Sequence, residues 1–383
     1  MEIRAGYKQT DIGIIPEDWE VKKLGEVLKI KHGKSQKEVE DRSGNIPILG
    51  TGGLMGFANT FLYDKPSVLI GRKGTIDKPQ FMNTPFWTVD TLFYSEMIDG
   101  NNPKFLYYKF LMIDWYSYNE ASGVPSLNAK TIERISIATP PSIKEQNAIA
   151  LALSEIDDYI FSLENLITKK RNIKQGAMQK LLQPQEGWEV KKLGEKADIF
   201  RGGSPRPIED YLTIHPDGIN WIKIGDVKKN AKYIESTDEK IIPEGLSRSR
   251  FVNEGDFLLS NSMSFGRPYI LKIKGCIHDG WLVIQNYQDH FDRDFLYYVL
   301  GSEAILQQYK SMASGSSVLN LNKEIVKNVI INCPKSVDEQ AGIAKVLSDM
   351  DEEIISLETK LEKYRNVKLG MMQNLLTGKI RLN

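Results

Sequence analysis

The sequence has few of the features that mark secreted, metal-binding or membrane-spanning proteins. Its 383 residues include only two cysteines, Cys276 and Cys333, which are far apart and match no metal-binding spacing. Such sparse cysteine use favours the reducing cytoplasm. No run approaches the ~18 consecutive apolar residues of a membrane span, and the start, MEIRAGYKQTDIG, lacks the apolar core of a signal peptide. We therefore expect a cytoplasmic chain with no membrane contact and no metal site.

An excess of positive charge is also missing. The chain has 50 basic and 50 acidic residues. A protein that binds nucleic acid by itself more often carries an obvious basic excess. If this chain binds DNA, it must use local patches or share the task with a partner.

Catalytic motifs are absent as well. The glycine-rich stretch Leu49–Gly56 lacks the spacing of a dinucleotide-binding loop, and Gly71–Thr75 lacks that of a P-loop. The four histidines form no HExxH motif and have no paired spacing typical of a metal site. No Asn-Pro-Pro-aromatic or Asp-Pro-Pro-Tyr string of adenine methyltransferases occurs. The sequence thus favours a binding and scaffolding role with no catalytic residues and no cofactor of its own.

What the chain does contain is an internal repeat. Glu145–Leu182 aligns without a gap to Glu339–Leu376, and 20 of the 38 positions are identical. The block WEVKKLGE occurs at Trp19–Glu26 and again at Trp188–Glu195. Each half therefore reads as a block, a variable segment and a long helix, which is the pattern of a duplicated structural unit.

Each variable segment is predicted to be α+β. Runs rich in β-branched and aromatic residues predict strands at Ser67–Gly71, Phe86–Tyr94, Asn220–Ile224, Asp256–Ser260 and Trp281–Gln285. A short helix is predicted in both copies, at Pro103–Met112 and Arg293–Gly301. Further on, SGVPSLN (Ser122–Asn128) matches SGSSVLN (Ser314–Asn320) as a polar turn.

The long helices carry apolar residues that step by four and three positions. This heptad pattern favours a coiled coil, although such a stripe can also pack on the globular domain of its own copy. Ser142 and Ser336 are in place to cap the two helices. The stripe consists of Ile149, Leu153, Ile156, Ile160, Leu163 and Ile167, then Ile343, Leu347, Met350, Ile354, Leu357, Leu361 and Tyr364.

The direction of the helices follows from chain geometry. The second variable segment leaves the end of the first helix and returns to the start of the second, and a compact domain keeps those two ends close. The helices should then be antiparallel. We expect an α+β fold with two α/β domains at opposite ends of a long antiparallel two-helix coiled coil, related by a pseudo-twofold repeat. The expected segments are 1–140, 141–183, 184–333 and 334–383.

Identical residues also lie outside the heptad stripe, with apolar residues near both helix ends. A duplicated surface of this kind can hold two copies of one partner, although solvated surface and common origin would also explain it. The candidate partner-binding residues are Arg171, Asn172, Met178, Gln179, Arg365, Asn366, Met372 and Gln373.

Two pairs of loops are candidates for contact with DNA. Each places glycine beside hydroxyl or basic residues, which can bond phosphates or base edges. For any single residue, an ordinary exposed turn is an equally good interpretation. The candidates are Lys34, Gln36, Arg72, Lys73, Thr75 and Lys78 in the first half, and Arg201, Ser204, Arg206, Ser262, Ser264 and Arg267 in the second.

The order of these motifs resembles the specificity subunit of Type I restriction–modification systems along the whole chain. The resemblance rests on WEVKKLGE heading each half, the loops IGRKGT and SMSFGRP, the SG…LN turns, and EQ…IA…L…D helices ending in GxMQxLL. It implies that each variable segment is a target recognition domain for one half of a bipartite site in double-stranded DNA.

The resemblance also implies partners. Two methyltransferase subunits would dock on the helices to form an adenine-N6 methyltransferase, and motor–nuclease subunits can join. S-adenosylmethionine, ATP and magnesium would be used by those partners. Two rival interpretations stay open: a free-standing DNA-binding regulator, and a protein scaffold that binds no nucleic acid.

Overall fold

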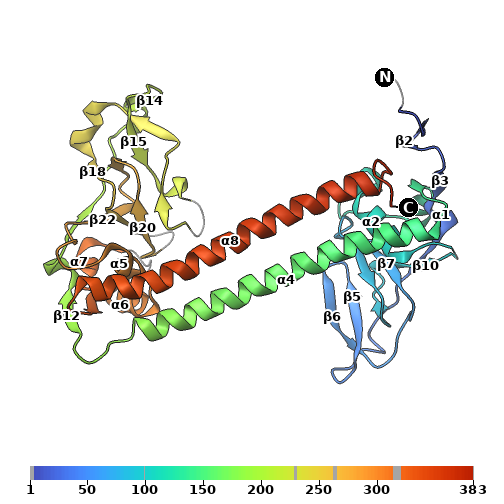
Figure 1. Cartoon of the computed structure of the whole chain (residues 1–383), viewed down its shortest axis with the longest axis horizontal. Coiled ribbons are helices and arrows are strands. Elements are labelled where there is room, and N and C mark those ends of the chain that lie inside the picture. The colour runs from blue at the N-terminus through green and yellow to red at the C-terminus, as the bar shows by residue number, and fades with distance from the viewer. Residues whose placement is uncertain (1–3, 99, 228–230, 262–264, 314–320, 383) are drawn as a thin grey trace. The chain divides into compact units, whose positions relative to one another are not determined.

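The chain forms two compact units (Figure 1). The computed structural model describes residues 4–98, 100–227, 231–261, 265–313 and 321–382. Unit 1 comprises Met1–Asn165 and Glu358–Asn383, and unit 2 comprises Leu166–Leu357. The boundaries expected after residues 140, 183 and 333 stay a prediction, because the compact units divide both long helices between them.

The two long helices are α4 (Ile143–Leu181) and α8 (Val337–Leu375), of 39 residues each. Both begin directly after the serines expected there. In unit 1 the rings of Tyr159 and Tyr364 are 4.5 Å apart. In unit 2, Lys170 Nζ lies 2.6 Å from Glu353 Oε1, and Lys174 pairs with Asp351 one turn further along. Increasing positions on α4 thus meet decreasing positions on α8, and the expected antiparallel direction is confirmed within each unit.

The apolar stripe has two kinds of neighbour. Near the start of each helix, residues of the stripe belong to the globular cores: Ile149 and Leu153 in unit 1, and Leu347 in unit 2. Further along, Leu163 and Leu361 are buried outside those cores, beside the contacts that join α4 to α8. The stripe therefore packs on the globular cores near the start of each helix and is buried beside helix–helix contacts further along, where coiled-coil packing stays a prediction.

Unit 1 contains sheets of four, three, two and two strands, in the orders β4-β10-β7-β8, β6-β5-β9, β11-β3 and β1-β2. The strand β7 is buried on both faces, which explains why its sequence SVLIG is one apolar run rather than an alternating one. The elements are β1 (Tyr7–Thr10), β2 (Gly13–Pro16), β3 (Glu20–Lys23), α1 (Leu24–Val27), β4 (Leu28–His32), β5 (Ile46–Gly50), β6 (Gly53–Ala58), β7 (Ser67–Gly71), β8 (Gln80–Met82), β9 (Trp87–Thr88), β10 (Leu92–Met97), α2 (Pro103–Leu111), η1 (Trp115–Tyr118), α3 (Ala129–Glu133) and β11 (Ser136–Thr139).

Unit 2 contains two five-stranded sheets, in the orders β13-β22-β19-β20-β16 and β14-β17-β15-β21-β18, and the pair β12-β23. The elements are β12 (Glu189–Lys192), η2 (Leu193–Glu195), β13 (Asp198–Arg201), η3 (Ile208–Asp210), β14 (Leu212–Thr213), β15 (Ile219–Ile222), η4 (Ile224–Asp226), β16 (Tyr233–Ile234), β17 (Glu239–Ile241), η5 (Pro243–Arg248), β18 (Arg250–Val252), β19 (Phe257–Ser260), β20 (Pro268–Leu271), β21 (Gly275–Ile277), β22 (Trp281–Gln285), α5 (Arg293–Leu300), α6 (Glu303–Ala313), α7 (Lys323–Lys327) and β23 (Ile330–Cys333).

Most of the predicted elements are present, and one is split. The run Phe86–Tyr94 was expected to be a single strand, but it forms β9 and β10 with a turn between them. Its apolar residues continue through the break because both strands are buried. Of the two matching turns, Ser122–Asn128 ends at Asn128, which caps α3. The second expected turn, Ser314–Asn320, lies outside the described residues, and α7 further on is capped by Asn322.

The end of the chain is part of unit 1. Met372, Leu375 and Leu376 belong to the same buried core as Trp19, and Tyr7 Oη donates to the carbonyl of Gly378 at 3.0 Å. The end of α8 therefore packs beside the first WEVKKLGE block.

Candidate nucleic-acid interface

Both units place their candidate DNA-binding loops on the same frame of strands. In unit 1, β10 lies between β4 and β7, and in unit 2, β22 lies between β13 and β19, always antiparallel. A parallel pair accompanies each sheet, β5 with β9 and β15 with β21. The loops that follow β4 and β13 are thus equivalent, as are those that follow β7 and β19.

A short turn with a central aspartate lies within this frame in both units. We call it the Asp turn: residues 89–91 in unit 1 and 278–280 in unit 2. The first residue of each turn donates its N–H to the parallel strand, at 3.0 Å from Val89 to Leu49 and at 3.1 Å from His278 to Ile222. The central residues are Asp90 and Asp279. The hydrogen bonds make the two turns structurally equivalent.

Glycine brings a loop against each Asp turn. A Cβ atom at Gly33 would lie 2.0 Å from the carbonyl oxygen of Val89, and one at Gly202 would lie 2.1 Å from that of His278. No side chain fits at such a distance, so glycine is required for close approach of the backbone. The next residue then donates an N–H: Lys34 to Thr88 at 2.8 Å, and Gly203 to Ile277 at 3.2 Å.

In unit 1 the Asp turn also holds Arg72. The N–H of Arg72 donates to the carbonyl of Thr91 at 2.8 Å, and its Nη1 donates to the carbonyl of Asp90 at 3.1 Å. Lys73 donates its N–H to Thr91 as well, at 3.2 Å. The loops that carry Lys34, Arg72 and Lys73 therefore converge on one turn, and all three side chains are exposed.

An open cavity of about 570 Å³ adjoins this turn. Arg72, Lys73 and His32 line it together with Ser126 and Asn128. The rest of the lining is apolar apart from Glu120, so the donors that could reach phosphate or the acceptor atoms of a base edge are gathered at Arg72, Lys73 and His32.

The other candidates of unit 1 lie on the same two loops without a described link to Arg72. Gln36 and Thr75 are half-buried, and Lys78 is exposed. Within the described residues, no hydrogen bond joins the side chains of these three to the Asp turn.

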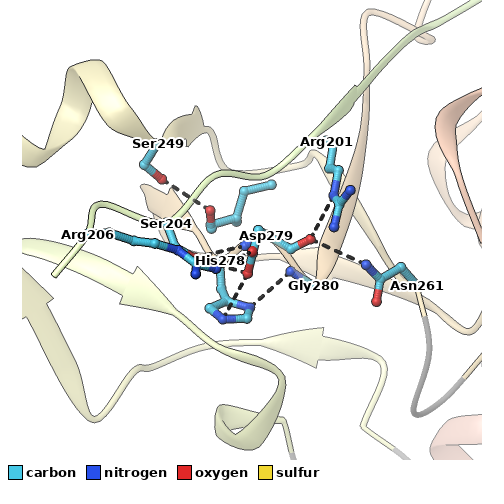
Figure 2. A network of polar contacts seen from close by, with 9 residues as sticks. Arg201, Ser204, Arg206, Ser249, Asn261, His278, Asp279 and Gly280 are labelled. Carbon is cyan, nitrogen blue, oxygen red and sulfur yellow. Dashed lines mark hydrogen bonds and ion pairs between the residues drawn. The ribbon is translucent and has the colours of Figure 1, made fainter. Parts of the chain in front are cut away.

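In unit 2 the Asp turn is the centre of a polar network (Figure 2). The carbonyl of Asp279 accepts Arg201 Nε at 3.0 Å and Asn261 Nδ2 at 3.3 Å. Its carboxylate accepts Ser204 Oγ at 3.1 Å and Arg206 Nη2 at 3.3 Å. Three candidates, Arg201, Ser204 and Arg206, are thus brought together by one residue.

The electrostatics of the network keep Asp279 charged. Partial burial alone would raise the pKa of this carboxyl. The nearby His278, whose Nε2 lies 3.0 Å away, outweighs that effect together with Ser204, Arg206 and Arg201, and the pKa of Asp279 is held below its usual value. The Arg206 side chain remains 81% exposed, so its guanidinium can reach a ligand outside the protein.

The remaining candidates of unit 2 are Ser262, Ser264 and Arg267. Ser262 and Ser264 lie outside the described residues. Arg267 is half-buried, and its guanidinium lies 5.5 Å from the centre of the Tyr269 ring.

The sequence interpretation missed the Asp turn, His278 and Asn261. A signal was present, because TVDTLF and IHDGWL align with aspartate just ahead of β10 and β22. The pattern is weak, since it shares only one identical residue, and it becomes clear only when the strand pairing is known.

The candidate partner-binding residues fall into two groups. Asn172, Gln179, Asn366 and Gln373 are exposed on the helices, as are Arg171 and Arg365; Arg365 pairs with Glu164 at 2.6 Å. Met178 is half-buried against the core of unit 2. Met372 was expected on the surface, and this is wrong: it is buried in the core of unit 1, because the C-terminal segment packs there.

Neither a metal site nor a membrane-spanning helix is present among the described residues. No group of three or more His, Cys, Asp or Glu side chains is arranged to hold a metal ion. No helix among them is long and apolar enough to cross a membrane.

Comparisons with known proteins agree on one family. The model of the Type I restriction modification DNA specificity domain matches residues 16–175 and again residues 185–364. Two relatives from Methanocaldococcus jannaschii are 25% identical: the Type I restriction enzyme MjaVIII specificity subunit, covering 96% of this chain and 94% of the relative, and the putative type I restriction enzyme MjaX specificity subunit, covering 98% and 97%.

Solved structures share the fold. The S subunit of a Type I restriction–modification system from M. genitalium superposes with a TM-score of 0.65 at 16% identity, over 98% of both chains. A chain from a study of complex assembly and conformational transition of the type I R-M system gives 0.61 at 14% identity, over 96% of this chain and 99% of the other. With two domain matches that cover most of its length, the chain belongs to the Type I restriction modification DNA specificity domain family.

Proposed function

We propose that the chain is the DNA-reading subunit of a Type I restriction–modification complex, in which each unit carries a target recognition domain for one half of an asymmetric bipartite site. The observation that carries this proposal is the Asp turn. The same arrangement of strands and turn occurs in both units. The carbonyl of its aspartate accepts a hydrogen bond from Arg72, in the loop after β7, in unit 1, and from Arg201, at the end of β13, in unit 2.

Arginine is suited to this task. A guanidinium can donate two parallel hydrogen bonds to guanine in the major groove, or bind phosphate. Fixing the guanidinium on a turn carbonyl reduces the conformational freedom that it would lose on binding. The cavity beside Arg72 and the exposed Arg206 add donors on the same two surfaces.

Different reading surfaces favour an asymmetric target. Identical halves related by a twofold axis would read a palindrome. Here the residue that directly follows β7 in unit 1 is Arg72, and the one that follows β19 at the equivalent position of unit 2 is Asn261, so the two half-sites should differ in sequence.

The helices are the proposed docking site for two methyltransferase subunits. Exposed apolar side chains recur at the repeat spacing of 194 residues: Phe161 and Ile355 are 63% and 59% exposed, and Ile173 and Val367 follow the same spacing. Two copies of one partner fit a duplicated surface. S-adenosylmethionine would be used by these partners, and ATP and magnesium by motor–nuclease subunits where they join.

The balanced charge of the chain is consistent with shared DNA binding. Affinity for DNA depends on how many phosphates are neutralised, and a chain with 50 basic and 50 acidic residues gains from partners that supply part of that charge. We therefore expect weak DNA binding by the isolated chain and tight binding by the complex.

Co-expression with the methyltransferase of the same system, followed by sequencing of methylated DNA, tests the proposal. A bipartite motif with a fixed gap is expected. Arg72→Ala should weaken the preference in one half-site and Arg201→Ala in the other. Tight, specific binding by the chain alone would favour a free-standing regulator, and absence of any DNA preference in the complex would favour a protein scaffold.

A further inference from the structure

A polar cluster joins the globular part of unit 1 to both long helices. Tyr108 of α2 donates its hydroxyl to Asp157 Oδ2 of α4 at 2.8 Å. The other carboxylate oxygen of Asp157 lies 2.5 Å from Lys368 Nζ of α8. Ser154 adds a contact of 3.5 Å to the tyrosine hydroxyl. One carboxylate is therefore held by a helix of the globular part and by the opposite long helix at the same time.

Unit 2 contains the same cluster, built from the equivalent residues. Tyr298 of α5 donates to Asp351 Oδ2 of α8 at 2.7 Å, and its hydroxyl lies 3.2 Å from Ser348 Oγ. Lys174 of α4 pairs with the same aspartate. The roles of α4 and α8 are exchanged, as a pseudo-twofold relation requires.

These contacts explain identical residues that lie outside the apolar stripe. Asp157 and Lys174 are separated by 17 residues on α4, and Asp351 and Lys368 by 17 residues on α8. One antiparallel register therefore satisfies both clusters. A slip of either helix by one turn, about 5.4 Å, would break both ion pairs.

The clusters are suited to hold an orientation as well as to add stability. Tyr108 and Tyr298 are almost fully buried. Burial, with the neighbouring aspartate, raises the pKa of both hydroxyls, so both remain protonated donors. A buried donor that loses its acceptor is costly, and this cost penalises any rotation of α2 or α5 away from the long helices.

We propose that Tyr108–Asp157–Lys368 and Tyr298–Asp351–Lys174 are two equivalent clamps, which fix the orientation of each recognition domain on the helix pair and thereby determine how strictly the complex requires one gap length between half-sites. The inference rests on the proposed function. The six residues are positioning residues, because they act through the orientation of the reading surfaces and touch no DNA.

The test measures gap preference in the complex of the full chain with its methyltransferase. The substrate is a DNA library in which the two half-sites are separated by the native gap or by gaps one or two base pairs shorter or longer. Tyr108→Phe removes the hydroxyl, and Asp157→Asn keeps an acceptor but removes the ion pair. Each should lower the methylation ratio of native to off-length gaps by on the order of tenfold, as expected for a hydrogen bond to a charged group, while base preference within each half-site is unchanged.

Matched controls separate the clamp from a general loss of stability. Asp158→Asn removes an exposed carboxylate from the next position of α4, and Tyr116→Phe removes an exposed hydroxyl from unit 1; both should keep the wild-type ratio. If Tyr108→Phe does not co-purify with the methyltransferase, the gap preference is measured with Lys368→Gln instead. This variant removes the ion pair and leaves the tyrosine hydrogen bond in place.

Two results would overturn the inference in different ways. A wild-type ratio in Tyr108→Phe and Asp157→Asn, with only a lower melting temperature, would reduce the clusters to structural contacts and leave the proposed function intact. A wild-type complex that methylates no bipartite site would remove the proposed function, and the clamp inference with it.

Discussion

Lys109 is buried at the point where the end of α8 meets unit 1. Its Nζ donates to the carbonyl of Leu376 at 2.5 Å and lies 5.4 Å from the centre of the Trp19 ring. Burial lowers the pKa of this ammonium to about 7. In unit 2 the equivalent position is occupied by Val299, whose side chain has no ionisable group.

A pH dependence of stability follows from this burial. Between about pH 7 and the ordinary lysine pKa of 10.5, the unfolded chain binds a proton at Lys109 that the folded chain does not. Burying Lys109 therefore costs the most folding stability at pH 7 and below, and this cost decreases as the pH rises. Comparing urea unfolding of the wild type and Lys109→Met at pH 7 and pH 9.5 checks this: the difference in unfolding free energy should favour the wild type more at pH 9.5. Parallel pH profiles would contradict the buried-lysine account.

Asp279 allows a second prediction at the scale of single residues. Asp279→Ala removes the acceptor that holds Ser204 and Arg206, and we expect methylation of the target to slow by about tenfold, since hydrogen bonds to charged groups are involved. Asp90→Ala is the matched control, because within the described residues the Asp90 carboxylate has no hydrogen-bond partner. Equal effects of the two substitutions would argue against a special role for the Asp279 network.

At the scale of elements, the length of helix between the two clamps should set the gap between the half-sites, and this can be tested by insertion. Inserting seven residues between Asp157 and Lys174, and seven between Asp351 and Lys368, preserves the apolar stripe and lengthens each helix by about 10 Å, close to three base pairs of DNA. Methylation sequencing should then report a gap about three base pairs longer. The same insertion in α4 alone should abolish methylation, because the two clamps would no longer fit one register.

The sequence predicted those elements whose pattern of buried residues is visible in a short local run. The run SVLIG is apolar throughout and forms β7 as expected, and the repeated stretches Glu145–Leu182 and Glu339–Leu376 match α4 and α8 to within two residues at each end. The break between β9 and β10 was missed because the run is apolar on both sides of the turn. The Asp turn was missed because its geometry depends on a parallel strand pair that no local pattern records.

The candidate site was predicted in part for the same reason. Glycine next to arginine marked two loops whose backbone makes a close approach that requires glycine, at Arg72 and Arg201; their contact with DNA stays a prediction. Which side chains meet, and that an aspartate organises them, depends on contacts between residues such as Ser204 and Asp279, 75 positions apart. The burial of Met372 was missed because identity between the two copies was taken to indicate an exposed partner surface, whereas buried residues can be identical as well.

At the scale of the whole chain, both of its ends contribute to unit 1. Arg381 pairs with Asp18 and with Glu145 at 2.8 and 2.5 Å, and Leu376 is almost completely buried. Leu376→Ala should therefore destabilise unit 1 by about 2–5 kcal/mol. The repeat supplies a control in Leu182→Ala, which removes a half-buried side chain from unit 2 and should cost less. Hydrogen exchange measured by peptide would assign each loss to its unit; a loss from Leu376→Ala confined to unit 2 would contradict the assignment of the C-terminal segment.

This arrangement has a consequence for the order of events during translation. Synthesis of unit 1 begins before that of unit 2, but the core of unit 1 lacks Met372, Leu375 and Leu376 until the segment that follows unit 2 has been made. Unit 2 lies wholly between the two pieces in the sequence, so it can complete its core while unit 1 still waits. The recognition domain that starts earliest is thus the last to mature, and an unfinished chain would expose the apolar surface around Trp19 to chaperones and proteases.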